Sequence, residues 1–142
     1  MPWGWFGRTK IVITPSVSDW VVVDSSGWVE YMGDGAKANS YAAYLQSPEN
    51  LLLPSIIVYE VYKKLVREQG QHLAEVFLSQ AFGFRDRLID LTLELSVLAS
   101  RTSLETRLPM ADAIIYATAQ HHRAQLITSD SHFANLPGVT LV

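Results

Sequence analysis

Four acidic residues, Asp24, Glu60, Asp112 and Asp130, could do chemistry together if the fold gathers them. They are spaced by 36, 52 and 18 residues, so they form no local motif. Carboxylates that converge repel one another, and a hard divalent cation such as Mg²⁺ or Mn²⁺ relieves that repulsion. Such an ion can neutralise charge on a phosphodiester and supply hydroxide at neutral pH. The four residues are therefore candidate metal ligands and catalytic groups.

Asp24 and Asp130 each follow an apolar segment that has the pattern of a buried strand. Asp24 ends the run Trp20–Val23, and Asp130 follows Leu126–Thr128. In a parallel sheet, ligands bind beyond the carboxyl ends of the strands, which is where both residues are expected. Each residue also has a simpler interpretation, because Asp24 could cap the next helix and Asp130 could form a turn.

Glu60 and Asp112 lie in segments with helical periodicity. Glu60 precedes Lys63 and Lys64 by three and four residues, which could mean no more than a solvated ion pair. Asp112 is more informative because it is the one charge in the nearly all-apolar segment 110–119. Burying an unpaired carboxylate costs several kcal/mol, and the positive end of the helix dipole offsets only part of that cost. A bound cation would offset the rest.

Two hydroxyl residues near the acids could support them. Ser26 and Thr128 could each donate a hydrogen bond that fixes a neighbouring carboxylate, as groups behind metal ligands often do. Three cations, Lys63, Lys64 and Arg67, follow Glu60 by one and two turns and could bind flanking phosphates. A plain solvated helix face explains them equally well. His132 could contact phosphate, although a histidine in a turn needs no function.

The order of elements predicts an α/β fold. Strands are expected at residues 20–23, 51–53, 88–91, 126–128 and 139–142, and helices at 26–32, 35–46, 56–69, 71–82, 92–101 and 110–123. Strands that alternate with helices predict a three-layer α/β/α sandwich around a mostly parallel sheet of four to five strands. Residues 1–18 read as an N-terminal extension, and residues 19–142 as one domain.

Composition excludes several classes of protein. There is no cysteine, so thiolate metal sites, disulfides and cysteine nucleophiles are excluded, and a reducing cytoplasm is the expected location. No secretory signal or membrane-spanning stretch is apparent. The net charge of −3 does not argue against a nucleic-acid substrate, because four of the negative charges are assigned to a metal.

Residues 20–142 resemble the PIN-domain nucleases, in particular the VapC-type toxins of toxin–antitoxin pairs. The resemblance rests on four segments, which are Val-Val-Val-Asp24-Ser-Ser26, Ile-Val-Tyr-Glu60-Val, Leu108-Pro-Met-Ala-Asp112-Ala, and Leu126-Ile-Thr128-Ser-Asp130-Ser-His-Phe133 followed by Pro137-Gly. The Leu-Pro-Met-Ala-Asp-Ala segment and the Thr-x-Asp-x-x-Phe segment are the most specific of these.

The resemblance implies an endoribonuclease that uses Mg²⁺ or Mn²⁺, commonly forms a homodimer and is inhibited by a cognate antitoxin. Asp24, Glu60, Asp112 and Asp130 fall on the acidic quartet of the family, and Ser26 and Thr128 on its supporting hydroxyls. Two features depart from the family pattern. His132 stands where many relatives carry a further acid, which puts a second metal in doubt, and the extension 1–18 precedes the usual start.

Two other functions fit parts of this pattern. A phosphatase or phosphotransfer domain could use Asp24 as a nucleophile. Haloacid-dehalogenase-like enzymes would also need a second Asp at position 26 and an activating Lys before the late acids. This chain has Ser26 and no such Lys. A catalytically silent PIN-fold module could instead receive a basic side chain of a partner protein in its acidic pocket. The four intact acids favour the nuclease.

Overall fold

The computed structural model describes residues 19–142, so the predicted extension 1–18 lies outside the described residues. Five strands form one sheet in the order β3-β2-β1-β4-β5, and every neighbouring pair is parallel. The strands are β1 (Val21–Val23), β2 (Leu51–Pro54), β3 (Leu88–Ile89), β4 (Gln125–Thr128) and β5 (Val139–Leu141). The prediction of a parallel sheet is confirmed.

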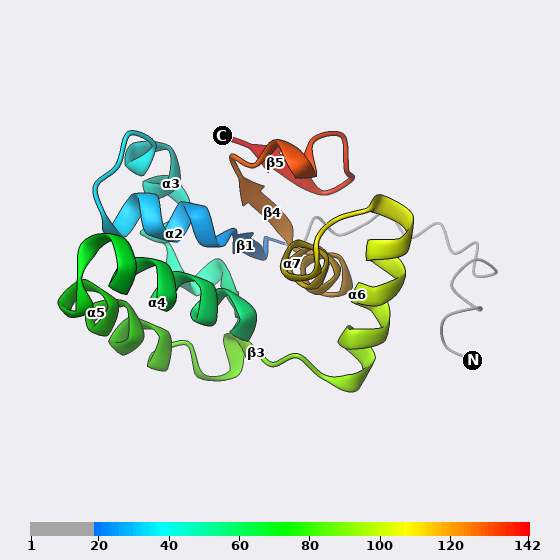
Figure 1. The fold of residues 1–142 in the computed structure, drawn as a ribbon, viewed down its shortest axis with the longest axis horizontal. Helices are drawn as coiled ribbons and strands as arrows, with labels where there is room; N and C mark the ends of the chain where they lie inside the picture. The colour runs from blue at the N-terminus through cyan, green and yellow to red at the C-terminus, as the bar shows by residue number, and fades with distance from the viewer. Residues whose placement is uncertain (1–18) are drawn as a thin grey trace.

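The helices α2 to α7 connect the strands. They are α2 (Ser25–Met32), α3 (Ala38–Leu45), α4 (Ser55–Gln69), α5 (Gln71–Phe82), α6 (Leu93–Thr106) and α7 (Met110–His121). Three short 3₁₀ turns are η1 (Pro48–Asn50), η2 (Arg85–Arg87) and η3 (Ser131–Phe133). In Figure 1, helices α2 to α5 lie to the left of the sheet and α6 and α7 lie to its right. The α/β/α sandwich is therefore confirmed.

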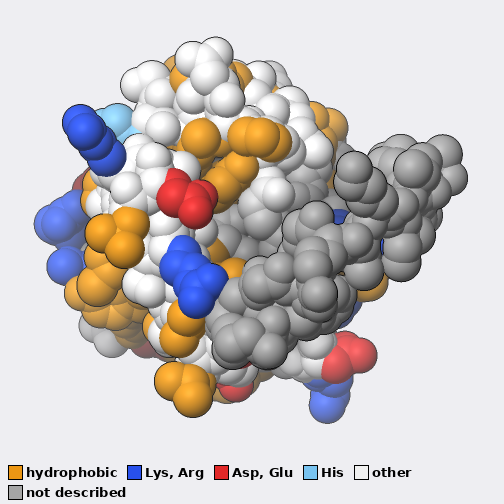
Figure 2. All heavy atoms as spheres, turned by 90° about the vertical axis from the view of Figure 1, so that its right-hand side faces the viewer, with side chains coloured by type: hydrophobic (Ala, Val, Ile, Leu, Met, Phe, Trp, Pro, Cys, Tyr) orange, Lys and Arg blue, Asp and Glu red, His pale blue; other side chains and the backbone are white. Residues whose placement is uncertain are grey.

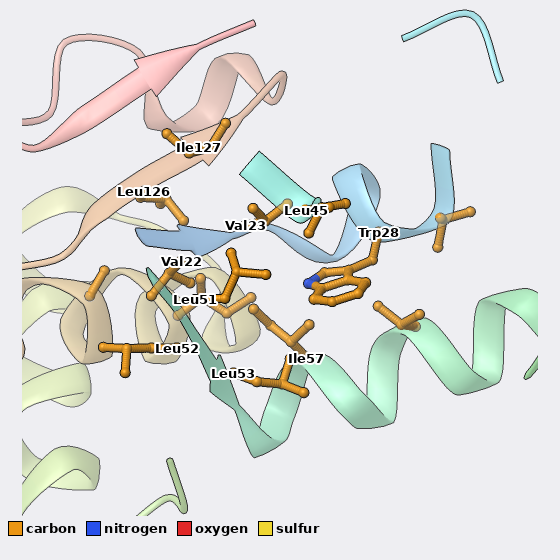
Figure 3. Close-up of a cluster of buried hydrophobic side chains, with 14 of the residues drawn as sticks. Val22, Val23, Trp28, Leu45, Leu51, Leu52, Leu53, Ile57, Leu126 and Ile127 are labelled. Carbon is orange, nitrogen blue, oxygen red and sulfur yellow. The ribbon is translucent and has the colours of Figure 1, made fainter. Parts of the chain in front are cut away.

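The sheet separates two apolar layers because successive residues of a strand point to opposite faces. Val23 extends toward Leu45 of α3, and Leu53 lies beside Ile57 of α4 (Figure 3). Side chains of the opposite face meet α7, in which residues 113–119 are all buried. This burial confirms the interpretation of the apolar 110–119 segment as an internal helix. No helix among residues 19–142 is long and apolar enough to span a membrane.

The largest difference from the predicted elements is the length of α6. The helix was expected to end at residue 101, where polar residues begin, but it continues to Thr106. The hydroxyls of Thr102 and Thr106 donate to carbonyls one turn earlier, at 2.9 and 2.7 Å, so these polar side chains are satisfied within the helix. The helix ends at Arg107, which is left-handed with φ of 63°. Strand β3 is shorter than expected and ends at Ile89.

Candidate metal centre

The register between β1 and β4 sets Asp24 beside Thr128. Val23 pairs with Ile127, and the Asp24 backbone N–H donates to the Ile127 carbonyl at 2.9 Å. The next residue of each chain segment therefore lies at the same edge of the sheet. Asp24 is 4% exposed, and Thr128 is completely buried. Two residues from opposite ends of the domain thus meet at the carboxyl ends of the two strands.

Both carboxylate oxygens of Asp24 accept hydrogen bonds. Oδ1 accepts from the Ser25 backbone N–H at 2.8 Å, which makes Asp24 the N-cap of α2, and Oδ2 accepts from the Thr128 hydroxyl at 2.8 Å. Burial raises the pKa of Asp24, the two hydrogen bonds lower it, and the charge of Asp130 raises it further. Helix capping is therefore one role of Asp24, and the bond to Thr128 adds a second constraint that a cap does not need.

Thr128 links two of the acids. Its hydroxyl donates to Asp24 and accepts a 3.0 Å hydrogen bond from the Asp130 backbone N–H. The supporting role predicted for this hydroxyl agrees with these contacts. Ser26 differs, because its hydroxyl oxygen is buried and has no hydrogen-bond partner within the described part of the chain, although its proximity lowers the pKa of Asp24 slightly.

Asp112 lies in the first turn of α7, three residues after Pro109. Its side chain is 19% exposed. Burial, followed by the charges of Asp24, Asp130 and Glu60 in that order, raises the pKa of Asp112 to about 6. Charge therefore couples Asp112 to the other three predicted acids, and an Asp130 oxygen lies within 4.8 Å of an Asp112 oxygen. Asp24 is likewise coupled by charge to Asp112, Asp130 and Glu60.

Glu60 lies in the second turn of α4 and makes no ion pair with Lys63 or Lys64 among residues 19–142. No contact ion pair forms there, although the charges of both lysines act on Glu60. Lys63 instead contacts the Tyr59 hydroxyl at 3.3 Å. Burial raises the pKa of Glu60, while the nearby Ser25 side chain and the two lysines lower it and the Asp24 charge raises it. One oxygen, Oε1, is buried without a hydrogen-bond partner.

Asp130 caps the 3₁₀ turn η3 and brings an imidazole into the cluster. Its Oδ1 accepts from the His132 backbone N–H at 2.8 Å. His132 Nδ1 lies 3.5 Å from Asp130 Oδ1 and 3.7 Å from Asp112 Oδ2. One donor atom each from Asp112, Asp130 and His132 lies within 4.8 Å of the others. Asp24 and Glu60 are coupled to this group by charge but lie outside it.

Sequence reasoning gave little weight to two contributors to this region. A histidine in a turn needs no function, so the sequence gives His132 little weight. The turn η3 after β4 brings His132 close to Asp112, and no local sequence pattern predicts that contact. Tyr41 is completely buried, and its hydroxyl donates to Ser129 Oγ at 3.0 Å. This bond fixes the backbone between Thr128 and Asp130.

A divalent cation fits the residues present. The donor set is rich in carboxylate oxygens, which hard divalent cations prefer. The cluster lacks a lysine or arginine partner, since among residues 19–142 no such side chain forms an ion pair with any of the four acids. The unpartnered Oε1 of Glu60 and the raised pKa of Asp112 both indicate unbalanced negative charge that a cation would compensate.

Comparison with known proteins agrees with this description. The family model described as PIN domain matches residues 21–139. No curated protein sequence gives a significant match.

Several solved structures share the fold. A toxin–antitoxin complex from Klebsiella pneumoniae contains a chain that is 24% identical, with a TM-score of 0.67 over 84% of this chain and 95% of that one. The VapC20 toxin of Mycobacterium tuberculosis, described as cleaving the sarcin–ricin loop, is 19% identical, with a TM-score of 0.68 over 84% and 96%. VapBC2 from Rickettsia felis, bound to promoter DNA, is 17% identical, with a TM-score of 0.65 over 86% and 96%.

Proposed function

The chain belongs to the PIN domain family, and we propose that it is a metal-dependent endoribonuclease that hydrolyses RNA phosphodiester bonds. The observation that carries this proposal is the electrostatic coupling of Asp112, whose pKa is raised by burial and by the charges of the other three acids. A structural ion-pair network would contain basic partners. A cluster of carboxylates without them is the arrangement that a cation-binding hydrolase needs.

In this proposal the metal is Mg²⁺ or Mn²⁺, held by Asp24 and Asp112 with help from Glu60 and Asp130. The bound ion would neutralise charge on the scissile phosphate and favour hydroxide formation from water. Thr128 and the Ser25 N–H hold the Asp24 carboxylate in one orientation. Glu60 is the proposed group that orients the attacking water, because its Oε1 is buried and free to accept a hydrogen bond. Its raised pKa also suits a proton acceptor.

We assign the protein the role of the toxin in a toxin–antitoxin pair. Support comes from the structural neighbours, several of which were solved as toxin–antitoxin complexes. An apolar groove of about 380 Å³ on the α2–α3 side is lined by Trp28, Tyr31, Leu45 and Phe84 and could receive an amphipathic segment of the antitoxin. The absence of cysteine from the sequence fits a reducing cytoplasm.

A homodimer is part of the proposal. Figure 2 views the molecule from the side of α6 and α7 and shows hydrophobic side chains at the surface. Leu93, Leu104 and Met110 are 84%, 84% and 75% exposed, and Leu104 and Met110 line a groove of about 600 Å³ between the two helices. An apolar surface of this kind favours association. Light scattering should give twice the chain mass for the native protein and the chain mass for Leu104→Glu.

The central test is cleavage of total RNA by the purified protein with Mg²⁺, with Mn²⁺ and with EDTA, followed by mapping of the cut ends. We expect cuts only with a divalent ion. Asp24→Asn and Asp112→Asn should abolish them, whereas Asp86→Asn should not, because Asp86 is exposed and precedes β3 at the other edge of the sheet. Metal-independent cutting, or full activity in either site variant, would defeat the assignment. A protein that binds no metal would instead favour a silent binding module.

A further inference from the structure

The position of His132 at the edge of the acid cluster is fixed by its neighbours in sequence. Asp130 accepts the His132 backbone N–H, and the next residue, Phe133, is completely buried and packs near Tyr116 of α7. The turn η3 is therefore anchored on both sides of His132. The imidazole itself is 64% exposed, so it is free to adjust its orientation while its backbone is held beside Asp112 and Asp130.

The distances from the His132 imidazole to the neighbouring carboxylates are those between two ligands of one metal ion, and they are too long for hydrogen bonds. His132 Nδ1 lies 3.5 Å from Asp130 Oδ1 and 3.7 Å from Asp112 Oδ2, beyond the usual range of an N–H···O bond. Two ligands that each lie 2.0–2.2 Å from one ion at a tetrahedral angle are about 3.4 Å apart. The imidazole nitrogen thus already stands at a separation from each oxygen that a common ion allows, and the three atoms lie within 4.8 Å of one another.

Other histidines do not share this position. His122 Nδ1 is 2.9 Å from the Thr118 carbonyl, His121 packs edge-to-face on His122, and His72 is exposed on α5. Within residues 19–142, His132 is the imidazole that groups with acids at metal-binding distance. The nitrogen donor is thus a specific feature of this site.

We propose that His132 is a metal ligand together with Asp112 and Asp130, and that it makes the site prefer a first-row transition ion over Mg²⁺. Imidazole binds transition ions such as Co²⁺ and Zn²⁺ well, whereas Mg²⁺ selects oxygen ligands. An acid at this position would add a third hard ligand, so the histidine shifts selectivity away from Mg²⁺. This inference rests on the proposed metal-dependent function, because it presupposes that the acids bind a divalent ion.

The test is calorimetric titration of the metal-free protein with Co²⁺ and with Mg²⁺. Wild-type protein should bind Co²⁺ more tightly than Mg²⁺. His132→Ala should lower the Co²⁺ affinity by about tenfold or more, since even the groups behind metal ligands contribute 10–100-fold. The same variant should leave the Mg²⁺ affinity nearly unchanged, and His132→Asp should bring the two affinities closer together. His72→Ala is the matched control and should behave as wild type.

A spectroscopic measurement checks ligation directly. Bound Mn²⁺ should show ¹⁴N modulation in pulsed electron paramagnetic resonance for wild type and His72→Ala, and none for His132→Ala. An unchanged Co²⁺ to Mg²⁺ affinity ratio in His132→Ala, with binding still lost in Asp112→Asn, would overturn this inference and leave the proposed function standing. If wild type binds neither ion, both fail.

Discussion

The Thr128 hydroxyl donates a 2.8 Å hydrogen bond to Asp24 Oδ2 across 104 residues of sequence. The Thr128 hydroxyl oxygen also accepts a hydrogen bond from the backbone N–H of Asp130 at 3.0 Å. One buried hydroxyl therefore orients one acid and the backbone of another. The arrangement explains how the carboxylate of Asp24, a residue that is 4% exposed, is held in place although no basic side chain among residues 19–142 forms an ion pair with it.

Thr128→Val should destabilise the protein and weaken metal binding. The substitution keeps the shape of the side chain but leaves a buried carboxylate oxygen and a backbone N–H without a partner, which costs about 1–3 kcal/mol for each group that stays unsatisfied. Urea unfolding of the metal-free protein measures the loss. The control is Thr118→Val, because Thr118 is also buried but its hydroxyl bonds only to the Ile114 carbonyl of its own helix. A loss no larger than that of the control would show that the Asp24 contact contributes nothing.

Asp112 should make the metal-free protein more stable in mild acid. Its pKa is about 6 in the folded state and 3.8 in the unfolded state, so the folded state binds more protons between about pH 4 and pH 6. The free energy of unfolding should therefore rise as the pH falls through this window and decline again as the pH rises through 6. The difference corresponds to at most ~3 kcal/mol, since one pKa unit is ~1.4 kcal/mol.

Asp112→Asn tests this assignment. The variant should be more stable than wild type at pH 7 without metal, and its unfolding free energy should change less between pH 4 and pH 6. Asp86→Asn should follow the wild-type curve. If the unfolding free energies of wild type and Asp112→Asn depend on pH in the same way, the pKa of Asp112 is not raised in the folded state.

Added Mn²⁺ should raise the melting temperature, because an ion that binds the folded state alone stabilises it by mass action, by about 2.7 kcal/mol at a hundred times the dissociation constant. Glu60→Gln should reduce this shift and abolish RNA cleavage. Glu94→Gln is the control, since Glu94 is exposed in the first turn of α6. If Mn²⁺ raises the melting temperature of wild type and Glu60→Gln equally, Glu60 is not part of the proposed centre. If the control variant also fails to cut RNA, the loss of cleavage in Glu60→Gln is not specific to Glu60.

Lys64 should contribute to RNA binding more than Arg67 does. Lys64 lines a small polar pocket with Ser26 and Ser129 beside the acids, whereas Arg67 lies 3.6 Å from Glu68. Lys64→Ala should weaken binding to RNA for all sequences alike and reduce the slope of log affinity against log salt by about 1. Arg67→Ala should change both less. Filter binding at several salt concentrations measures the slopes, and identical slopes for the two variants would assign Lys64 to a plain solvated face.

Most of the fold was predictable because its signals are local. The apolar run before Asp24 predicts a buried strand, and the segment 110–119 predicts an internal helix because it is apolar on every side. The end of α6 was not predictable from the same rules, since Thr102 and Thr106 bond to their own helix instead of ending it. The assignment of the four acids as ligands stays a prediction.

By itself, the sequence determined which strands end in an acid, which internal helix carries a single charge and which side chains are able to bind a cation. These features depend on residue types within a few positions of one another. The tertiary structure alone decided that Thr128 faces Asp24, that Glu60 Oε1 is buried and that His132 stands beside Asp112. Those relationships depend on strand register and helix packing, in which contacts between distant segments set distances that no local pattern encodes.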